Sequence, residues 1–242
     1  MFAAADVLGR LSGGLIASCQ PVRGGVFDRP ELVALFALAA LDGGAVGLRL
    51  EGLSDLRAVR AGIDAVGRAV PIVGLVKVDA PADEAFITPR LEDARALVAA
   101  GADVVAFDAT DRRRPVPVRE MVRAIHASGA LAMADVASEA EGVAAHLAGA
   151  DFVASTLSGY APGSSQLPGP DLALVARLAQ AGARVVAEGR IATPAEAVAA
   201  RAHGAFAITI GTAFSRPEWI VHGFVDALGR AAGAPDHVAG SG

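Results

Sequence analysis

Two ionisable residues stand at the ends of short apolar runs, where they could exchange protons with a bound molecule. Lys77 ends the run 72–77, and Glu188 ends the run 184–188. Partial burial favours the neutral amine of a lysine, which can then act as a base or as a Schiff-base amine. An enclosed carboxyl group can supply the matching acid. Lys77 is the only lysine among 21 basic residues, but this skew reflects composition, so its position carries the argument.

Other polar residues also follow apolar runs. Gln20, Arg49, Asp108 and Asp135 stand at the ends of four further runs, and Ser158 and Tyr160 follow a fifth. Asp135 could orient Lys77 or bind a sugar hydroxyl. The structural alternatives are a surface position or an ion pair with Asp79 or Asp108 for Lys77, and an ion pair with Arg190 or Arg216 for Glu188. We keep Asp108, Ser158 and Tyr160 as candidate substrate contacts.

The segments after the last two apolar runs have the composition of a phosphate site. Gly189 and Arg190 follow one run, and Gly211, Thr212 and Arg216 follow the other. Glycine lets the backbone approach a phosphate, amide groups at helix starts donate to it, and arginine adds positive charge. In eight-stranded α/β barrels, phosphate commonly binds at these two loops.

The pattern of apolar residues predicts the elements that would position these side chains. Short apolar runs alternate with Ala-rich segments of helical period. The runs predict eight strands: Leu15–Ser18, Ala45–Leu50, Ile72–Lys77, Val104–Asp108, Leu131–Asp135, Phe152–Thr156, Arg184–Glu188 and Phe206–Gly211. The intervening segments predict eight helices: Pro30–Leu41, Asp55–Arg68, Leu91–Ala100, Val118–Ser128, Glu139–Ala148, Asp171–Ala181, Pro194–His203 and Pro217–Arg230.

Eight consecutive strand–helix units predict an α/β fold, a single (β/α)8 TIM barrel over residues 1–232, with residues 233–242 as a flexible tail. An open, doubly wound sheet of five or six strands is the structural alternative. In a barrel the carboxyl ends of all strands meet at one mouth. The third and seventh strands are four apart in the ring, so we expect Lys77 and Glu188 to face each other across that mouth.

Composition narrows the functional classes. The 242-residue chain is 53% apolar with a net charge of −5, which disfavours a nucleic-acid partner. It has one cysteine, Cys19, no membrane-length apolar run and no signal-peptide pattern, so we expect a cytoplasmic protein without a membrane partner. No nucleotide-binding glycine motif follows a strand. The five histidines fall on predicted helices, a helix end or the tail, so we expect no metal site.

Several segments together resemble the bacterial N-acetylmannosamine-6-phosphate 2-epimerases. They follow the order of that family from about residue 15 to about residue 220 of this chain, and the series is far more specific than any one member. The matching segments are Leu15–Gln20, Gly43–Arg49, Pro71–Lys77, Phe86–Pro89, Asp108–Thr110 with Arg112 and Arg114-Pro115, Met133–Asp135, Thr156–Tyr160, Ala187–Ile191 with Thr193-Pro194, and Gly211–Ala213 with Ser215–Pro217.

The resemblance implies a barrel of the ribulose-phosphate-binding type and an isomerase of amino-sugar and sialic acid catabolism. The implied reaction interconverts N-acetylmannosamine 6-phosphate and N-acetylglucosamine 6-phosphate at C2, with no metal or organic cofactor. Lys77 matches the base of the family and Glu188 its acid. Asp135 and Arg49 match residues around the reacting carbon, and Gln20 matches a substrate contact. We expect a phosphorylated amino sugar as the ligand and a homodimer as the assembly.

Two alternatives remain at this stage. A related lyase or aldolase-type barrel would use Lys77 to form a Schiff base with a phosphosugar. A regulatory barrel would bind a phosphosugar without catalysis, although the presence of both Lys77 and Glu188 argues against it.

Overall fold

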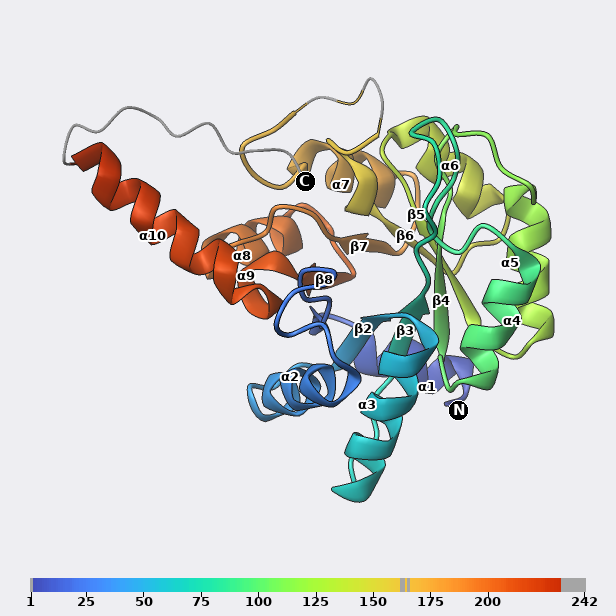
Figure 1. Cartoon of the computed structure of the whole chain (residues 1–242). Helices are drawn as coiled ribbons and strands as arrows, with labels where there is room; N and C mark the ends of the chain where they lie inside the picture. The colour runs from blue at the N-terminus through green and yellow to red at the C-terminus, as the bar shows by residue number, and fades with distance from the viewer. Residues whose placement is uncertain (1, 162–163, 165, 232–242) are drawn as a thin grey trace.

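Eight short parallel strands form a closed ring in which neighbours in sequence are neighbours in space (Figure 1). The computed structural model describes residues 2–161, 164 and 166–231. β1 pairs with both β2 and β8, which closes the barrel. The predicted TIM barrel is therefore confirmed, and the open sheet is excluded. The strands are β1 (Leu15–Ser18), β2 (Gly47–Glu51), β3 (Ile72–Leu75), β4 (Val104–Asp108), β5 (Leu131–Asp135), β6 (Phe152–Ala154), β7 (Val185–Ala187) and β8 (Ala207–Ile210).

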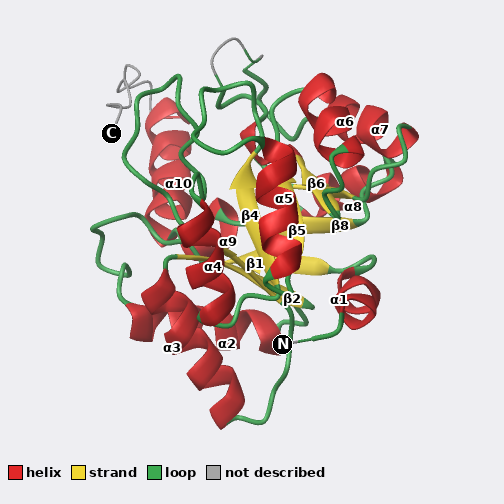
Figure 2. Ribbon diagram, turned by 90° about the vertical axis from the view of Figure 1, so that its right-hand side faces the viewer, coloured by secondary structure: helices red, strands yellow, loops and turns green. Residues whose placement is uncertain are grey.

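Helices surround the strands on the outside of the barrel (Figure 2). Those predicted between the strands are α2 (Pro30–Asp42), α3 (Leu53–Ala65), α4 (Leu91–Ala99), α5 (Val118–Ala127), α6 (Glu139–Leu147), α7 (Leu172–Gln180) and α8 (Pro194–Ala202). Thr193 caps α8: its side chain accepts from the Glu196 amide, and the Glu196 carboxylate accepts from the Thr193 amide. This reciprocal cap satisfies two amides that a helix start leaves free.

Three short elements were not predicted from the sequence. They are α1 (Ala4–Leu11), the 3-10 turn η1 (Ser155–Leu157) and α9 (Thr212–Ser215). α1 precedes the first strand, and its Val7 and Leu11 pack with Ile16 and Val73 in one buried cluster. Such a short helix is stabilised by packing rather than by its own propensity, so its sequence gives only a weak signal.

The core has two layers, as expected for a packed barrel. Inside the ring, side chains such as Ile16, Leu75, Met133 and Phe152 form one cluster. A second layer lies between the strands and the surrounding helices and consists largely of Ala, Val, Leu and Ile. Small branched residues allow helices to approach a parallel sheet closely. The result is a rigid frame whose carboxyl ends carry the polar residues.

The strand ends differ from the prediction where the site begins. β3 ends at Leu75, two residues before the predicted end, and Lys77 instead forms an isolated antiparallel bridge with Ile87. β7 ends at Ala187, so Glu188 also lies just beyond its strand. The predicted tail, residues 233–242, lies outside the described residues.

The last helix, α10 (Pro217–Ala231), projects away from the barrel (Figure 1). Val221, Phe224, Val225 and Leu228 recur at helical spacing on one side of α10, and each is more than half exposed. In a regular barrel, the helix after β8 would cover the outside of β8 and β1. These four side chains, here called the α10 stripe, therefore form an apolar surface that is open to solvent.

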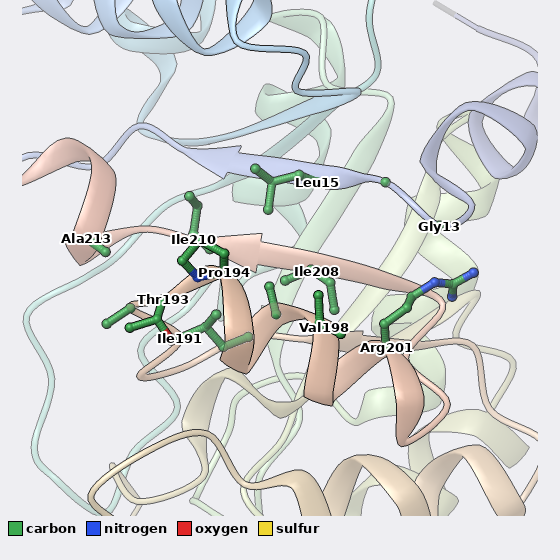
Figure 3. Close-up of a pocket in the computed structure, with 13 residues that line it drawn as sticks. Gly13, Leu15, Ile191, Thr193, Pro194, Val198, Arg201, Ile208, Ile210 and Ala213 are labelled. Atoms are coloured by element: carbon green, nitrogen blue, oxygen red, sulfur yellow. The ribbon is translucent and has the colours of Figure 1, made fainter.

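An apolar groove of about 460 Å³ runs along β1, β8 and α8 (Figure 3). Its walls are mostly aliphatic and include Leu15, Pro194, Val198, Ile208 and Ile210. It occupies the place that the eighth helix of a regular barrel would cover. No helix among the described residues is long and apolar enough to cross a membrane.

Candidate active site

A cavity of about 660 Å³ opens at the carboxyl ends of the strands. Positive side chains predominate among the charged residues of its wall, which suits an anionic ligand. Residues of its wall include Gln20, Arg49, Lys77, Thr156, Tyr160, Glu188, Gly189, Arg190, Thr209, Gly211, Thr212, Arg216 and Trp219. The predicted mouth thus gathers residues from both ends of the chain.

Lys77 reaches this cavity from the segment after β3. Its Nζ donates to Gln20 Oε1 and to Glu51 Oε2, each at 2.7 Å. Its side chain is 31% exposed, so the amine is accessible from the cavity. The sequence alternatives of an ion pair with Asp79 or Asp108 are wrong, because Glu51 is the partner.

A buried ion cluster connects β2, β5 and β7. Arg49 donates to both carboxylate oxygens of Asp135, at 3.2 and 2.7 Å. The same guanidinium lies 3.1 Å from Glu188 Oε2. The Thr156 hydroxyl lies 2.8 Å from Asp135 and 3.2 Å from Glu188. The partner of Glu188 is therefore Arg49, not Arg190 or Arg216 as the sequence alternative supposed.

The surroundings of Glu188 suit a proton donor. Burial raises the pKa of Glu188, and nearby Asp135 raises it too, whereas Arg49 and Thr156 lower it; the net direction is upward. For Arg49, burial lowers the pKa, but Asp135 and Glu188 more than compensate, so the net shift is upward and the charge is retained. A carboxyl group with a raised pKa keeps its proton to higher pH than a free carboxyl group, so it can act as a proton donor.

Asp135 itself is fully buried behind Arg49 and Thr156. The suggestion that it orients Lys77 is therefore wrong. Its contacts instead fix Arg49, which in turn contacts Glu188. The structure places Asp135 behind Arg49 and Thr156 rather than at the cavity wall.

The chain after β7 bends sharply at the cavity. Gly189 has φ +105° and Arg190 has φ +56°, so the second is a rare non-glycine residue in the left-handed region. Arg190 Nη1 donates to the Ser158 carbonyl at 2.6 Å, and its Nε donates to the Gly169 carbonyl at 2.8 Å. These bonds hold the strained turn and fix the guanidinium at the cavity.

The segment after β8 lies beside the segment after β1. A Cβ atom at Gly211 would lie 3.4 Å from the Ser18 side chain, so the two segments are in van der Waals contact. Arg216 Nε donates to the Gln20 carbonyl at 3.2 Å. Gly211, Thr212 and Arg216 therefore line one side of the cavity, adjoining Gly189 and Arg190.

Asp108 and Ser158 stabilise the rim and do not face the cavity. Asp108 is fully buried, where it accepts from Thr110 at 2.6 Å and from Arg112 at 3.1 Å. The Ser158 hydroxyl donates to Asp171 at 2.7 Å. Neither geometry supports the predicted substrate contact. Tyr160 does line the cavity, and the Arg190 guanidinium lies 5.4 Å from its ring centroid.

Three residues at the site were not among the predicted ones. Glu51 ends β2 beside Lys77, and Thr156 bridges Asp135 and Glu188. Thr209 is a buried hydroxyl within β8 that lines the cavity, and its Oγ1 has no hydrogen-bond partner within the described part of the chain. A polar residue inside the apolar run Ile208–Ile210 was a usable signal for Thr209. The pairing of Thr156 depends on contacts that the sequence does not reveal.

We expect Arg49→Met to destabilise the protein by about 3–5 kcal/mol, because it leaves two carboxylates buried without their cation. Loss of the cation also raises the pKa of Glu188 further. The folded variant then binds a proton more tightly than the unfolded chain, so the defect should grow as pH rises from 5 to 8. Denaturant unfolding at pH 5 and at pH 8 measures the free energy of unfolding of the variant and of wild type.

Arg57→Met is the matched control, because Arg57 is an exposed residue of α3. It should unfold with wild-type stability at both pH values. An equal loss in the two variants would contradict the importance of the buried cluster.

Comparison with known proteins shows the family to which the chain belongs. A family model described as "Putative N-acetylmannosamine-6-phosphate epimerase" matches residues 33–230. A protein of Yersinia pseudotuberculosis serotype O:1b, named "Putative N-acetylmannosamine-6-phosphate 2-epimerase", is 53% identical over 219 residues, which is 90% of this chain and 91% of that protein. A Yersinia pestis protein of the same name is 52% identical over the same shares.

Solved structures give the same relationship. The N-acetylmannosamine-6-phosphate 2-epimerase from Clostridium perfringens superposes with a TM-score of 0.86 at 35% identity and covers 91% of this chain and 95% of its own. A deoxyribose phosphate aldolase from Aeropyrum pernix has a TM-score of 0.59 at 18% identity, covers 93% of this chain and 100% of its own, and shows the fold alone. The chain belongs to the N-acetylmannosamine-6-phosphate epimerase family.

Proposed function

We propose that this protein interconverts N-acetylmannosamine 6-phosphate and N-acetylglucosamine 6-phosphate in amino-sugar and sialic acid catabolism. The observation that carries this proposal is that Lys77 and Glu188 line one cavity from strands that are four apart in the ring. The names of the relatives support the choice of substrate. The single cysteine, which is buried, suits the cytoplasm as the place of action.

Inversion of C2 needs a proton to leave one face of the carbon and another to reach the opposite face. In the proposed mechanism Lys77 takes the C2 proton of the open-chain aldehyde. The electron pair of the C–H bond forms the C1–C2 double bond, and the C1 carbonyl oxygen takes the negative charge, so that an enolate forms. Glu188 then donates its proton to the other face of C2. The reverse reaction uses the same groups with their protonation states exchanged.

Arg49 and Asp135 would serve this step by holding Glu188. The Arg49 guanidinium lies against both carboxylates, and Asp135 is fixed in turn by Thr156. A rigid neighbourhood reduces the reorganisation needed when charge develops in the transition state. Gln20, bonded to Lys77, lines the cavity where it could also contact the sugar.

The phosphate would bind between the segments after β7 and β8. Gly189 and Gly211 leave room for a close backbone approach, and Arg190 and Arg216 provide positive charge. Thr212 supplies a hydroxyl at the same wall. Anchoring a distant phosphate would fix C2 between Lys77 and Glu188, which lowers the entropic part of the barrier.

We expect deuterium from heavy water to appear at C2 of both amino sugar phosphates during turnover. Lys77→Ala and Glu188→Gln should each lower kcat by about two to four orders of magnitude, because each removes a proton-transfer group. NMR of the C2 proton measures exchange. Turnover without label at C2, or normal turnover by Lys77→Ala, would contradict the proposed mechanism.

Borohydride treatment with substrate separates the proposal from the Schiff-base alternative. The epimerase should leave no adduct, whereas an aldolase-type lysine would be trapped as a secondary amine. Mass spectrometry of the peptide that contains Lys77 gives the result.

In the direction in which Glu188 is the proton donor, we expect the reaction to slow as pH rises through the raised pKa of Glu188, because only the protonated carboxyl group can donate. Thr156→Val removes a hydrogen bond that lowers the pKa of Glu188. The alkaline limb of kcat/KM should therefore move to higher pH in this variant. An unmoved limb would argue against Glu188 as the donor.

We further propose that the protein is a homodimer in which α10 of each protomer lies in the apolar groove of its partner. The stripe on α10 and the groove along β1, β8 and α8 are both apolar and both open to solvent. α10 points away from its own barrel (Figure 1), and its length of about 22 Å suits a groove between neighbouring elements. Arg216 precedes α10 and Trp219 lies on it, so dimer assembly would also steady the phosphate wall.

We expect Phe224→Asp on the stripe and Val198→Asp in the groove to shift dimers toward monomers, since each puts a charge into an apolar interface. Val66→Asp, at an exposed apolar position after α3, should stay dimeric. Light scattering after gel filtration distinguishes the 24.2 kDa chain from its dimer. A monomeric wild type, or a fully dimeric Val198→Asp, would contradict this assembly.

A further inference from the structure

Glu51 lies next to Lys77 because of the strand register. β2 pairs with β3 so that Glu51 is opposite Leu75, the last residue of β3. The segment after β3 then brings Lys77 to the same level, where Nζ and Glu51 Oε2 are 2.7 Å apart. Both side chains are roughly one-third exposed, so the pair lies at the edge of the barrel mouth.

The contacts of Lys77 have a clear geometry. Gln20 lines the cavity and accepts from Lys77 through its amide oxygen, while its amide nitrogen donates to the buried Ser18 hydroxyl at 2.8 Å. Because a lysine ammonium only donates, the amide oxygen of Gln20 faces Lys77 and the amide nitrogen faces Ser18. Glu51 contacts the same Nζ but is not part of the cavity wall. One contact thus faces the ligand space, and the other lies behind the amine.

The charges around Lys77 come from several strands. Glu51 at the end of β2 is the carboxylate bonded to it, and Glu188 beyond β7 attracts it from across the mouth. Glu188, however, is held by Arg49 at 3.1 Å. Glu51 is therefore the carboxylate in direct contact with Lys77, whereas Glu188 is in direct contact with Arg49.

We propose that Glu51 is a positioning residue for Lys77, holding the ammonium against Gln20 from outside the ligand cavity. The inference rests on the proposed epimerase function. When Lys77 accepts a proton from C2, the new positive charge meets a carboxylate already in place. When Lys77 gives the proton back, the same contact keeps the amine directed at the cavity edge. Glu51 would thus act through Lys77, without touching the substrate.

The single lysine makes this proposal directly measurable. Protein labelled with 15N-lysine has one side-chain Nζ signal, whose chemical shift reports the hydrogen-bond surroundings of Lys77 independently of any activity. In Glu51→Gln the carboxylate charge is lost while an oxygen acceptor remains. The Nζ chemical shift should then differ from that of wild type at the same pH, because the charged partner at 2.7 Å is gone. Glu51→Asp, which keeps the charge, should lie between the two.

Asp79→Asn is the matched control. Asp79 follows Lys77 by two residues, but its side chain is 96% exposed and pairs with Arg23 at 2.9 Å. Removal of this carboxylate should leave the Nζ signal and the kinetics unchanged. An equal effect of Asp79→Asn and Glu51→Gln would mean that only general surface charge matters, and the proposal would fall.

Kinetics give the second measurement. We expect Glu51→Gln to lower kcat by about tenfold or more, with KM within about twofold, because a misplaced base slows the chemical step while the ligand contacts remain. Glu51→Asp should recover part of kcat. Wild-type kcat in Glu51→Gln, or a lower kcat with an unmoved Nζ signal, would overturn the role of Glu51. Absence of C2 exchange in wild type would instead refute the epimerase proposal, whatever the Nζ signal does.

Discussion

The arrangement of the site depends on one buried cation. Arg49 lies between Asp135 and Glu188 inside the upper end of the barrel, where an unpaired charge of either sign would be costly. Three strands must therefore present these residues at the same level. The arginine keeps two carboxylates close together without forcing both to take up protons. Burial nevertheless keeps the pKa of Glu188, the carboxyl group at the cavity wall, above its ordinary value, although Arg49 lowers it.

The closed ring places a second ionisable residue, Lys77, across the cavity from this cluster. Strand order and register place Glu188 and Lys77 on opposite sides of the same cavity, and Glu51 follows from the same register. The core of small aliphatic residues makes the ring rigid. Rigidity would serve the proposed proton transfer at carbon, which requires Lys77 and Glu188 both to stay within reach of one bound atom.

The departure of α10 gives the barrel an unusual outer surface. A regular (β/α)8 barrel covers every strand with a helix, but here β1 and β8 border an apolar groove while an apolar helix extends into solvent (Figures 1 and 3). Exposed apolar surfaces of this kind are typical of interaction sites. Since α10 begins directly after Arg216, the outer surface and the wall of the cavity are connected through a short stretch of chain.

The sequence by itself determined the eight strands, their order and the positions of Lys77 and Glu188, because hydrophobic periodicity and strand ends are local properties. Only the tertiary structure decided which charges meet. Glu51 and not Asp79 pairs with Lys77, Arg49 holds Glu188, and Asp108 is buried beneath the rim with Arg112. The direction of α10 was likewise beyond prediction, since its helical pattern fits a position on its own barrel equally well. Pairings between distant strands depend on register and side-chain packing in three dimensions, which residue types and spacing do not specify.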